Sequence, residues 1–300
     1  MASANYMGPK APVTLCFEKL GAFTDHLLLR DAKACSQRPA LLPHPHSGRR
    51  RLQIRDDFTL QCEHVVSASR GQQFLEITQD PNDIHAKENI LPGALTVAKV
   101  LLPIEILVPA LKIEALRAKF RAAAFYGERT INSMSWHYVD ESSVRVDVTA
   151  YQSQRVVATA SVFGEITREP LAIEEIKERK VNPDELSRVS EFMEVLGVHP
   201  EAYFDKDGLI DFTYPFAFMA ALPSGEIVRQ FEGVGGIINM LSLDLGDEAK
   251  MPITGSGAPE IRLKTGRVRQ TFQRIITDII DGITTYYRGA ALVYPSATVL

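Results

Sequence analysis

Residues 74–101 read FLEITQDPNDIHAKENILPGALTVAKVL, and this stretch decides the fold. Its first part is broken at Pro81, because the residue before a proline is driven towards extended geometry and a helix ends there. Its last part opens an apolar segment, Leu91 to Val108, that is hydrophobic on nearly every face. A helix of this kind must be covered on all sides. We therefore predict a short helix, a polar loop and then a fully buried helix.

The segments around this buried helix have the two-residue period of β-strands. Strands are predicted at residues 59–66, 129–139, 143–151 and 155–166. In the third of these segments valines alternate with polar residues, and short turns join the last three into an antiparallel meander. The combination predicts an α+β fold in which an antiparallel sheet wraps round one central helix.

The second half of the chain repeats this pattern. Residues 74–91 can be aligned with residues 192–210, which pairs Phe74 with Phe192. An apolar helical stretch and further strands follow in both halves. We therefore interpret the chain as two divergent copies of one fold.

The polar loop differs between the two copies in this alignment. Asp80 falls opposite Val198, and His85 falls opposite Tyr203. The second copy thus keeps the frame and lacks the titratable pair. This difference indicates that Asp80 and His85 serve a purpose other than holding the fold.

The repeat gives a division of the chain into four parts. A segment rich in Pro, His, Arg and Ser precedes the first strand, and a highly charged segment separates the two copies. The predicted parts are an N-terminal extension (1–55), a first domain (56–168), a linker (169–184) and a degenerate second domain (185–300).

Composition narrows the classes of function. The chain has 300 residues, 45% of them hydrophobic, and a net charge of -4, which suits a globular protein with two domains. The mild negative charge and the lack of a basic stripe argue against nucleic acid as a partner. Charged residues and prolines interrupt the longest apolar run, so we expect no membrane span. Three cysteines without metal-ligand spacing predict no metal site and fit a reducing cytoplasm.

The polar loop and the helix after it carry a resemblance to a known family. Asp80, Asn82 and His85 occur in the pattern D-x-N-x-x-H, and Gly93 opens the apolar helix. The stretch 74–101 resembles the signature of the MaoC-like hydratases and dehydratases, the R-specific enoyl-thioester hydratase family. The resemblance covers about residues 59–166 well and the second half as a degenerate copy. It implies two tandem hot-dog domains, a double hot-dog fold.

The resemblance implies hydration of 2-enoyl thioesters, or dehydration of (3R)-3-hydroxyacyl thioesters, without a cofactor. Such a reaction needs a base towards water and an acid towards the α-carbon, and a carboxylate and an imidazole that share one water can supply both. Asp80 is then the base and His85 orients the water and assists proton delivery, or the two exchange roles. Backbone N–H groups near Gly93 would stabilise the enolate oxygen, and Asn82 would fix the turn.

Several alternatives stay open at this point. A hot-dog thioesterase would use a carboxylate to drive water at the carbonyl carbon, and a non-catalytic subunit would only bind acyl thioesters. The substrate carrier is either CoA or an acyl carrier protein, and Lys99 in the apolar helix could reach solvent or a carrier phosphate. Pairing into a homodimer is also open.

Overall fold

The computed structural model describes residues 13–16, 42–43, 50–54, 57–108, 111–166, 183–199, 215–222, 224–225, 236–246, 260–262, 267–277 and 284–295. Near the N-terminus, three short strands pair in the order β1-β3-β2. They are β1 Val13–Cys16, β2 Leu42–Pro43 and β3 Arg50–Ile54. Most of the predicted linker and Tyr203 lie outside the described residues.

The described residues between 57 and 166 contain five strands and three helices. In chain order they are β4 Phe58–Val65, α1 Ala68–Thr78, α2 Ile84–Lys87, α3 Gly93–Leu107, β5 Leu111–Phe120, β6 Arg129–Tyr138, β7 Ser143–Gln152 and β8 Arg155–Ile166. The predicted buried helix and all four predicted strands of this half are confirmed, to within one or two residues at their ends. Strand β5, which follows α3, is the fifth strand of this part.

The described part of the second half contains two helices and four strands. They are α5 Pro183–Val195, α6 Phe216–Ala221, β9 Gly236–Gly246, β10 Glu260–Arg262, β11 Arg267–Thr277 and β12 Thr284–Pro295. Helix α5 begins inside the predicted linker. Strand β9 is not identified by the sequence patterns above.

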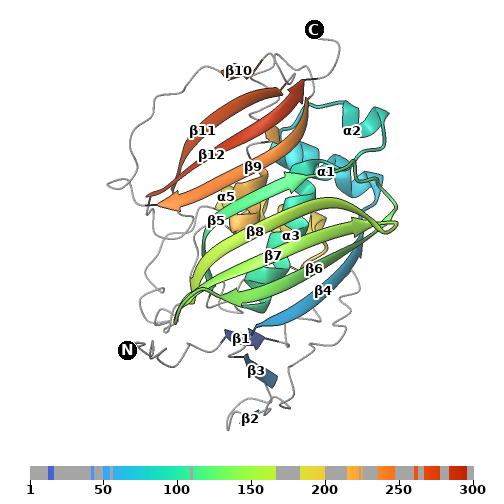
Figure 1. Ribbon diagram of the computed structural model, residues 1–300. Helices are drawn as coiled ribbons and strands as arrows, with labels where there is room; N and C mark the ends of the chain where they lie inside the picture. The colour runs from blue at the N-terminus through green and yellow to red at the C-terminus, as the bar shows by residue number, and fades with distance from the viewer. Residues whose placement is uncertain are drawn as a thin grey trace, which may run out of the picture.

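All strands from β4 to β12 form one antiparallel sheet, with the helices on one side of it (Figure 1). The strand order is β10-β11-β12-β9-β5-β8-β7-β6-β4. The order is mirrored about the β5–β9 pair, since β8, β7 and β6 follow β5 as β12, β11 and β10 follow β9. The predicted α+β class and the wrapping of a sheet round a helix are confirmed.

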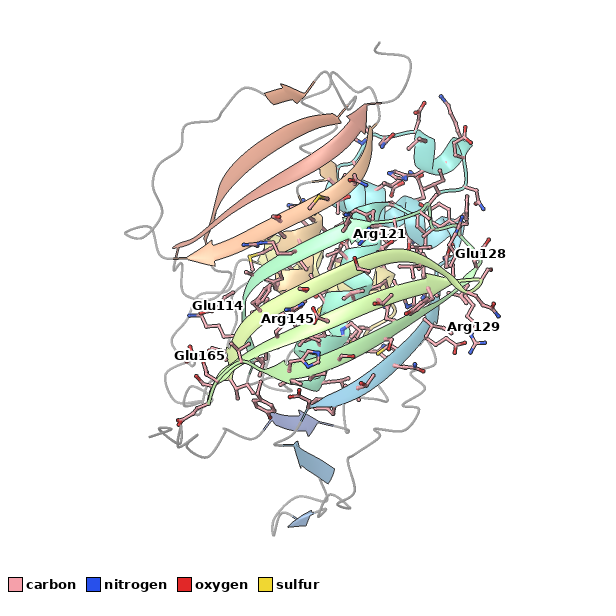
Figure 2. All side chains as sticks on the ribbon, in the orientation of Figure 1. Glu114, Arg121, Glu128, Arg129, Arg145 and Glu165 are labelled. Atoms are coloured by element: carbon pink, nitrogen blue, oxygen red, sulfur yellow. The ribbon has the colours of Figure 1, made fainter. Side chains whose placement is uncertain are left out.

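Helix α3 lies at the centre of the core. Every residue of α3 is buried except Gly93 and Glu105. The inward faces of strands β4 to β8 cover it, and the outer face of these strands is polar, with charged side chains such as Arg145 on it (Figure 2). This burial of apolar surface on all sides of α3 is the main driving force for folding of the first half.

One proline inside α3 leaves a carbonyl without its usual partner. Pro103 has no N–H, so the carbonyl of Lys99 cannot receive an intrahelical hydrogen bond. The buried Asn132 on β6 donates its Nδ2 to this carbonyl at 3.4 Å. A side chain of the sheet thereby donates a hydrogen bond to the carbonyl that Pro103 leaves without its usual donor.

Helices α1 and α5 end with the same backbone geometry. In α1, Gln79 is left-handed (φ 54°) and the Asp80 N–H donates to the Leu75 carbonyl at 2.8 Å. In α5, Gly197 is left-handed (φ 75°) and the Val198 N–H donates to the carbonyl of Met193 at 3.0 Å. These are the same positions in the alignment that pairs Phe74 with Phe192, and both helices stop in a Schellman-type turn.

The two aligned helices also contact each other. The rings of Phe74 and Phe192 lie 5.9 Å apart, centroid to centroid, between α1 and α5. Helices α3 and α6 also contact each other, and each begins after a proline N-cap of nearly identical backbone angles, Pro92 and Pro215. The helix ends at Gln79 and Gly197 thus fall at the positions that the sequence alignment pairs, while Pro92 and Pro215 lie five residues out of that register.

Among the described residues, no helix is long and apolar enough to cross a membrane.

Candidate active site

The carboxylate of Asp80 is buried directly after the end of α1. Its side chain is held from two sides: Oδ1 accepts the backbone N–H of Asn82 at 3.0 Å, and Oδ2 accepts a short hydrogen bond from the Ser224 hydroxyl. Asp80 is 5% exposed and Ser224 is also 5% exposed. The second half of the chain therefore supplies a direct partner of Asp80.

Asn82 shapes the loop between Asp80 and His85. Its Oδ1 accepts the backbone N–H of Ile84 at 3.3 Å, an Asx-type contact at the start of α2. Asn82 is buried, and its backbone also holds Asp80. The short helix α2 that follows carries His85 towards the same cavity.

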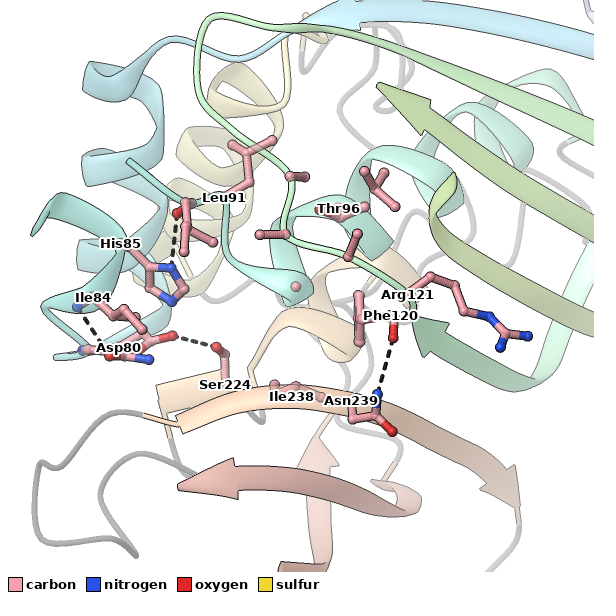
Figure 3. A pocket seen from close by; sticks show the side chains of 17 residues that line it. Asp80, Ile84, His85, Leu91, Thr96, Phe120, Arg121, Ser224, Ile238 and Asn239 are labelled. Carbon is pink, nitrogen blue, oxygen red and sulfur yellow. Dashed lines mark hydrogen bonds between the residues drawn. The ribbon is translucent and has the colours of Figure 1, made fainter. Parts of the chain in front are cut away.

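The imidazole of His85 is fixed in one tautomer by its surroundings. Nδ1 lies 3.0 Å from the Ile90 carbonyl, and because a carbonyl can only accept, the proton is on Nδ1 and Nε2 has a free lone pair. Burial lowers the pKa of His85, although the negative charge of Asp80 and the Ile90 carbonyl act in the opposite direction. The ring is therefore neutral near pH 7, with Nε2 turned towards the side of Asp80 and Ser224 (Figure 3).

The N-terminus of α3 opens on the same cavity. Its cap, Pro92, offers no side-chain hydrogen bond, and the first amides of a helix have no intrahelical acceptor. At Gly93, the first helical residue, a Cβ atom would lie 3.0 Å from Cζ of Phe120. Glycine thus lets the Phe120 ring lie against the helix start.

The cavity itself has a volume of about 210 Å³ and mostly apolar walls. Its lining residues are Asp80, Asn82, Ile84, His85, Ile90, Leu91, Gly93, Thr96, Phe120, Arg121, Ala122, Ala123, Ala124, Val157, Ser224, Ile238 and Asn239. The polar groups of Asp80, His85 and Ser224 gather at one end, while Arg121 and Asn239 lie at the other (Figure 3). An apolar cleft with a few convergent polar groups is the usual form of a small-molecule site.

The structure brings together all four residues that the sequence singles out: Asp80, Asn82, His85 and Gly93 line one cavity. Sequence reasoning misses Ser224, Ile238 and Asn239, which come from the second half. Ser224 stands in a Leu-Pro-Ser-Gly stretch with no pattern of its own, and its contact with Asp80 spans 144 residues.

Lys99 is a structural residue, so its predicted reach to solvent or to a carrier phosphate is wrong. The side chain is buried, and Nζ donates to the Leu196 carbonyl at 2.6 Å, just beyond the end of α5. A cation at a helix C-terminus is favoured by the helix dipole and by the unpaired carbonyls there. Lys99 therefore joins α3 to the second half of the chain.

Within the parts of the chain that the structure describes, no group of three or more His, Cys, Asp or Glu residues could hold a metal ion. The pair of Asp80 and His85 carries the titratable chemistry of this cavity. A carboxylate and a neutral imidazole at one end of an apolar cavity can bind a water molecule and move its proton.

Comparisons with known proteins bear on the fold. No protein-family model matches the sequence, and no curated protein matches it. A solved structure of a MaoC-like dehydratase superposes with a TM-score of 0.51 at 11% identity, over 79% of this chain and 98% of that one. HtdX from Mycobacterium tuberculosis gives a TM-score of 0.47 at 11% identity, over 77% and 98% of the two chains. The (R)-hydratase PhaJ1 from Pseudomonas aeruginosa gives 0.34 at 12% identity, over 39% and 84%.

The first of these likenesses spans nearly the whole of the related chain and most of this one. It agrees with the observed architecture, an antiparallel sheet curved round a buried helix. The hot-dog part of the fold predicted from the sequence resemblance is confirmed, since the chain has the fold of a MaoC-like dehydratase, and the tandem arrangement of two such domains stays a prediction.

Proposed function

We propose that this protein is a double hot-dog hydro-lyase that hydrates 2-enoyl thioesters, or dehydrates (3R)-3-hydroxyacyl thioesters, in a reversible reaction. One observation carries the proposal: a buried carboxylate and a neutral imidazole share an apolar cavity with the uncapped N-terminus of α3. An acyl thioester needs each of these parts, a wall for its chain, a water-activating pair and donors for its carbonyl oxygen.

The tandem arrangement is part of the proposal. A first domain at residues 56–168 would carry the reacting groups, and a degenerate second domain at 185–300 would cover it. The mirrored strand order about β5 and β9 supports this division. The shared turns at the ends of α1 and α5 support it as well.

In the hydration direction, a water molecule lies between His85 Nε2 and Asp80. Its oxygen attacks C3 of the enoyl thioester while Nε2 takes one of its protons, and the electron pair moves to the thioester oxygen. The imidazolium then returns the proton to C2, so the product is the 3-hydroxyacyl thioester and His85 is neutral again. Asp80 stabilises the imidazolium between the two steps. This is the exchanged assignment of the two roles, and the Nδ1 bond to the Ile90 carbonyl favours it.

The enolate oxygen would be bound by the first amides of α3. Helix α6 supports this use of a helix start, because its backbone N–H groups at Phe216 and Ala217 already donate to the two side-chain oxygens of Glu105. In α3 the corresponding amides begin at Gly93 and border the cavity. A preorganised pair of donors and the positive end of the helix dipole stabilise a developing oxyanion.

The carrier of the acyl group is CoA or an acyl carrier protein. Both present a phosphate on a pantetheine arm, and a guanidinium is a good partner for phosphate oxygens. Arg121 lies at the end of the cavity away from Asp80 and is exposed (Figure 3). We place the pantetheine arm at this end and the acyl chain along the apolar walls.

The test is loss of enoyl absorbance from 2-enoyl-CoA and 2-enoyl carrier-protein thioesters of several chain lengths. Wild type should consume the enoyl group and form the 3-hydroxy product, and Asp80→Asn should be slower by about 10²- to 10⁴-fold. Release of free thiol without a hydrated product would establish a thioesterase instead. Tight thioester binding with no turnover in either direction would establish a binding subunit.

A further inference from the structure

Glu105, a half-buried residue of α3, holds the start of helix α6. Its Oε1 accepts the Phe216 N–H at 2.6 Å while Oε2 accepts the Ala217 N–H at 3.1 Å. The N-cap of α6, Pro215, provides no side-chain hydrogen bond. A helix of six residues gains little stability from its own hydrogen bonds, so an external carboxylate on its first amides fixes where it sits.

The segment after α6 is fixed as well, against the active-site loop. The Ser224 hydroxyl donates to Oδ2 of Asp80. At Gly225, a Cβ atom would lie 2.4 Å from the Gln79 carbonyl oxygen, so this backbone rests directly on the turn that ends α1. A shift of α6 along α3 would therefore move the Ser224 hydroxyl relative to Asp80.

We propose that Glu105 is a positioning residue for Asp80: by holding the N-terminus of α6 it sets the place of Ser224, and Ser224 in turn orients the carboxylate that faces His85. The proposal rests on the proposed function where it concerns catalysis. Among the described residues, two hydrogen bonds hold the carboxylate of Asp80 in place. One comes from the backbone N–H of Asn82, which belongs to the same loop, and the other comes from the Ser224 hydroxyl. The position of Ser224 depends on α6, the helix just before it in the chain.

A purely structural role for Glu105 is the competing explanation, and a double-mutant cycle separates the two. The variants are Glu105→Gln, Ser224→Ala and the double variant. Glutamine keeps the size of the side chain, but its amide group can accept from only one of the two backbone N–H groups. If Glu105 acts through Ser224, the two single losses do not add.

We expect Glu105→Gln and Ser224→Ala each to lower kcat about tenfold with KM little changed. The double variant should be no slower than Ser224→Ala alone. The matched control is Asp140→Asn, because Asp140 also accepts two adjacent backbone N–H groups, those of Ser142 and Ser143, but in the exposed turn between β6 and β7. This control should keep the wild-type kcat.

A second readout needs no substrate. Asp80 raises the pKa of His85 by its charge, so displacement of Asp80 should change the His85 titration followed by NMR of ¹³C-labelled histidine. His85→Gln assigns the signal. Glu105→Gln and Ser224→Ala should shift this titration in the same direction, and the double variant should shift it no further.

The outcomes separate the two proposals. An inactive wild type with the expected NMR cycle would refute the hydro-lyase function and retain the positioning role. Additive losses in the double variant, or a Glu105→Gln protein that unfolds more easily but has wild-type kcat and His85 titration, would overturn the positioning role.

Discussion

The two halves of this chain share a backbone frame and differ in what fills it. Helices α1 and α5 end in the same turn, yet the residue after the turn is Asp80 in one and Val198 in the other, both buried. Helices α3 and α6 both follow a proline cap, yet one starts with Gly93 and the other with Phe216. The frame therefore does not require the polar residues, which supports a chemical purpose for them in the first half.

The second half makes contacts that support the polar loop of the first half. It supplies Ser224 to Asp80, and the first backbone N–H groups of its helix α6 donate to the Glu105 side chain, whereas the start of α3 in the first half borders the cavity. The comparison teaches that the first half directs its polar groups into a cavity, and that the second half uses the aligned positions for internal packing. Substitutions that convert one copy into the other test this directly.

The largest effect is expected from Asp80→Val, which places in the first loop the residue type found at the aligned position Val198 of the second half. Loss of the carboxylate should reduce the hydration rate by about 10³-fold or more, because the imidazolium loses its stabilising charge. The fold should persist, since Val198 occupies the equivalent turn. Enoyl absorbance gives the rate and circular dichroism gives the fold. A folded Asp80→Val protein with wild-type rate would contradict the assigned role of Asp80.

The next largest effect is expected on stability, from the Glu105 side chain that accepts the first backbone N–H groups of α6. Burial raises the pKa of Glu105 from 4.5 to about 7, although the amides of Phe216 and Ala217 act to lower it. Because the folded state holds this proton more tightly than the unfolded state, its contribution to stability is greatest below about pH 4.5 and is lost as pH rises to about 7. The loss amounts to at most about 3 kcal/mol.

Urea unfolding of wild type and Glu105→Gln between pH 4.5 and 8 measures this difference. Glutamine cannot ionise, so the free energy of unfolding of wild type should fall relative to the variant across that range. The same difference at every pH would show that Glu105 does not change its protonation on unfolding.

A smaller effect is expected from the titration of His85. Its pKa is lowered by burial, so the neutral ring that accepts a proton from water persists below the ordinary value of 6.5. The hydration kcat/KM should therefore stay level through pH 6.5 and fall about tenfold per pH unit only below the lowered pKa. In Asp80→Asn the fall should move to still lower pH, because the charge that favours imidazolium is gone. A fall that begins above pH 6.5 would contradict a neutral His85.

The sequence predicts the parts of this comparison that are local. Helix α3 and strands β4, β6, β7 and β8 follow from hydrophobic period, and the Asp80–His85 loop follows from its spacing. Strand β9 is not among the predicted strands, although Leu241, Leu243 and Leu245 alternate with polar residues, and its pairing with β5 joins the two halves, which no local pattern predicts. Ser224 and the Leu196 partner of Lys99 were missed for the same reason, since both are contacts between the halves.

The smallest effect is expected at the other difference between the copies, the first residue of α3. In Gly93→Ala the new Cβ would press on Phe120 at 3.0 Å, so the ring must shift by a few tenths of an ångström over the helix start. If the Gly93 amide binds the enolate oxygen, this shift should lower kcat about tenfold or less, and Gly93→Ala combined with Phe120→Leu should recover most of the loss, because leucine is smaller than the ring. Steady-state kinetics on all three proteins gives the comparison. If Phe120→Leu leaves the loss unchanged, the new methyl group itself blocks the thioester. The substrate oxygen would then lie against Gly93, and the Phe120 ring would not contact the substrate.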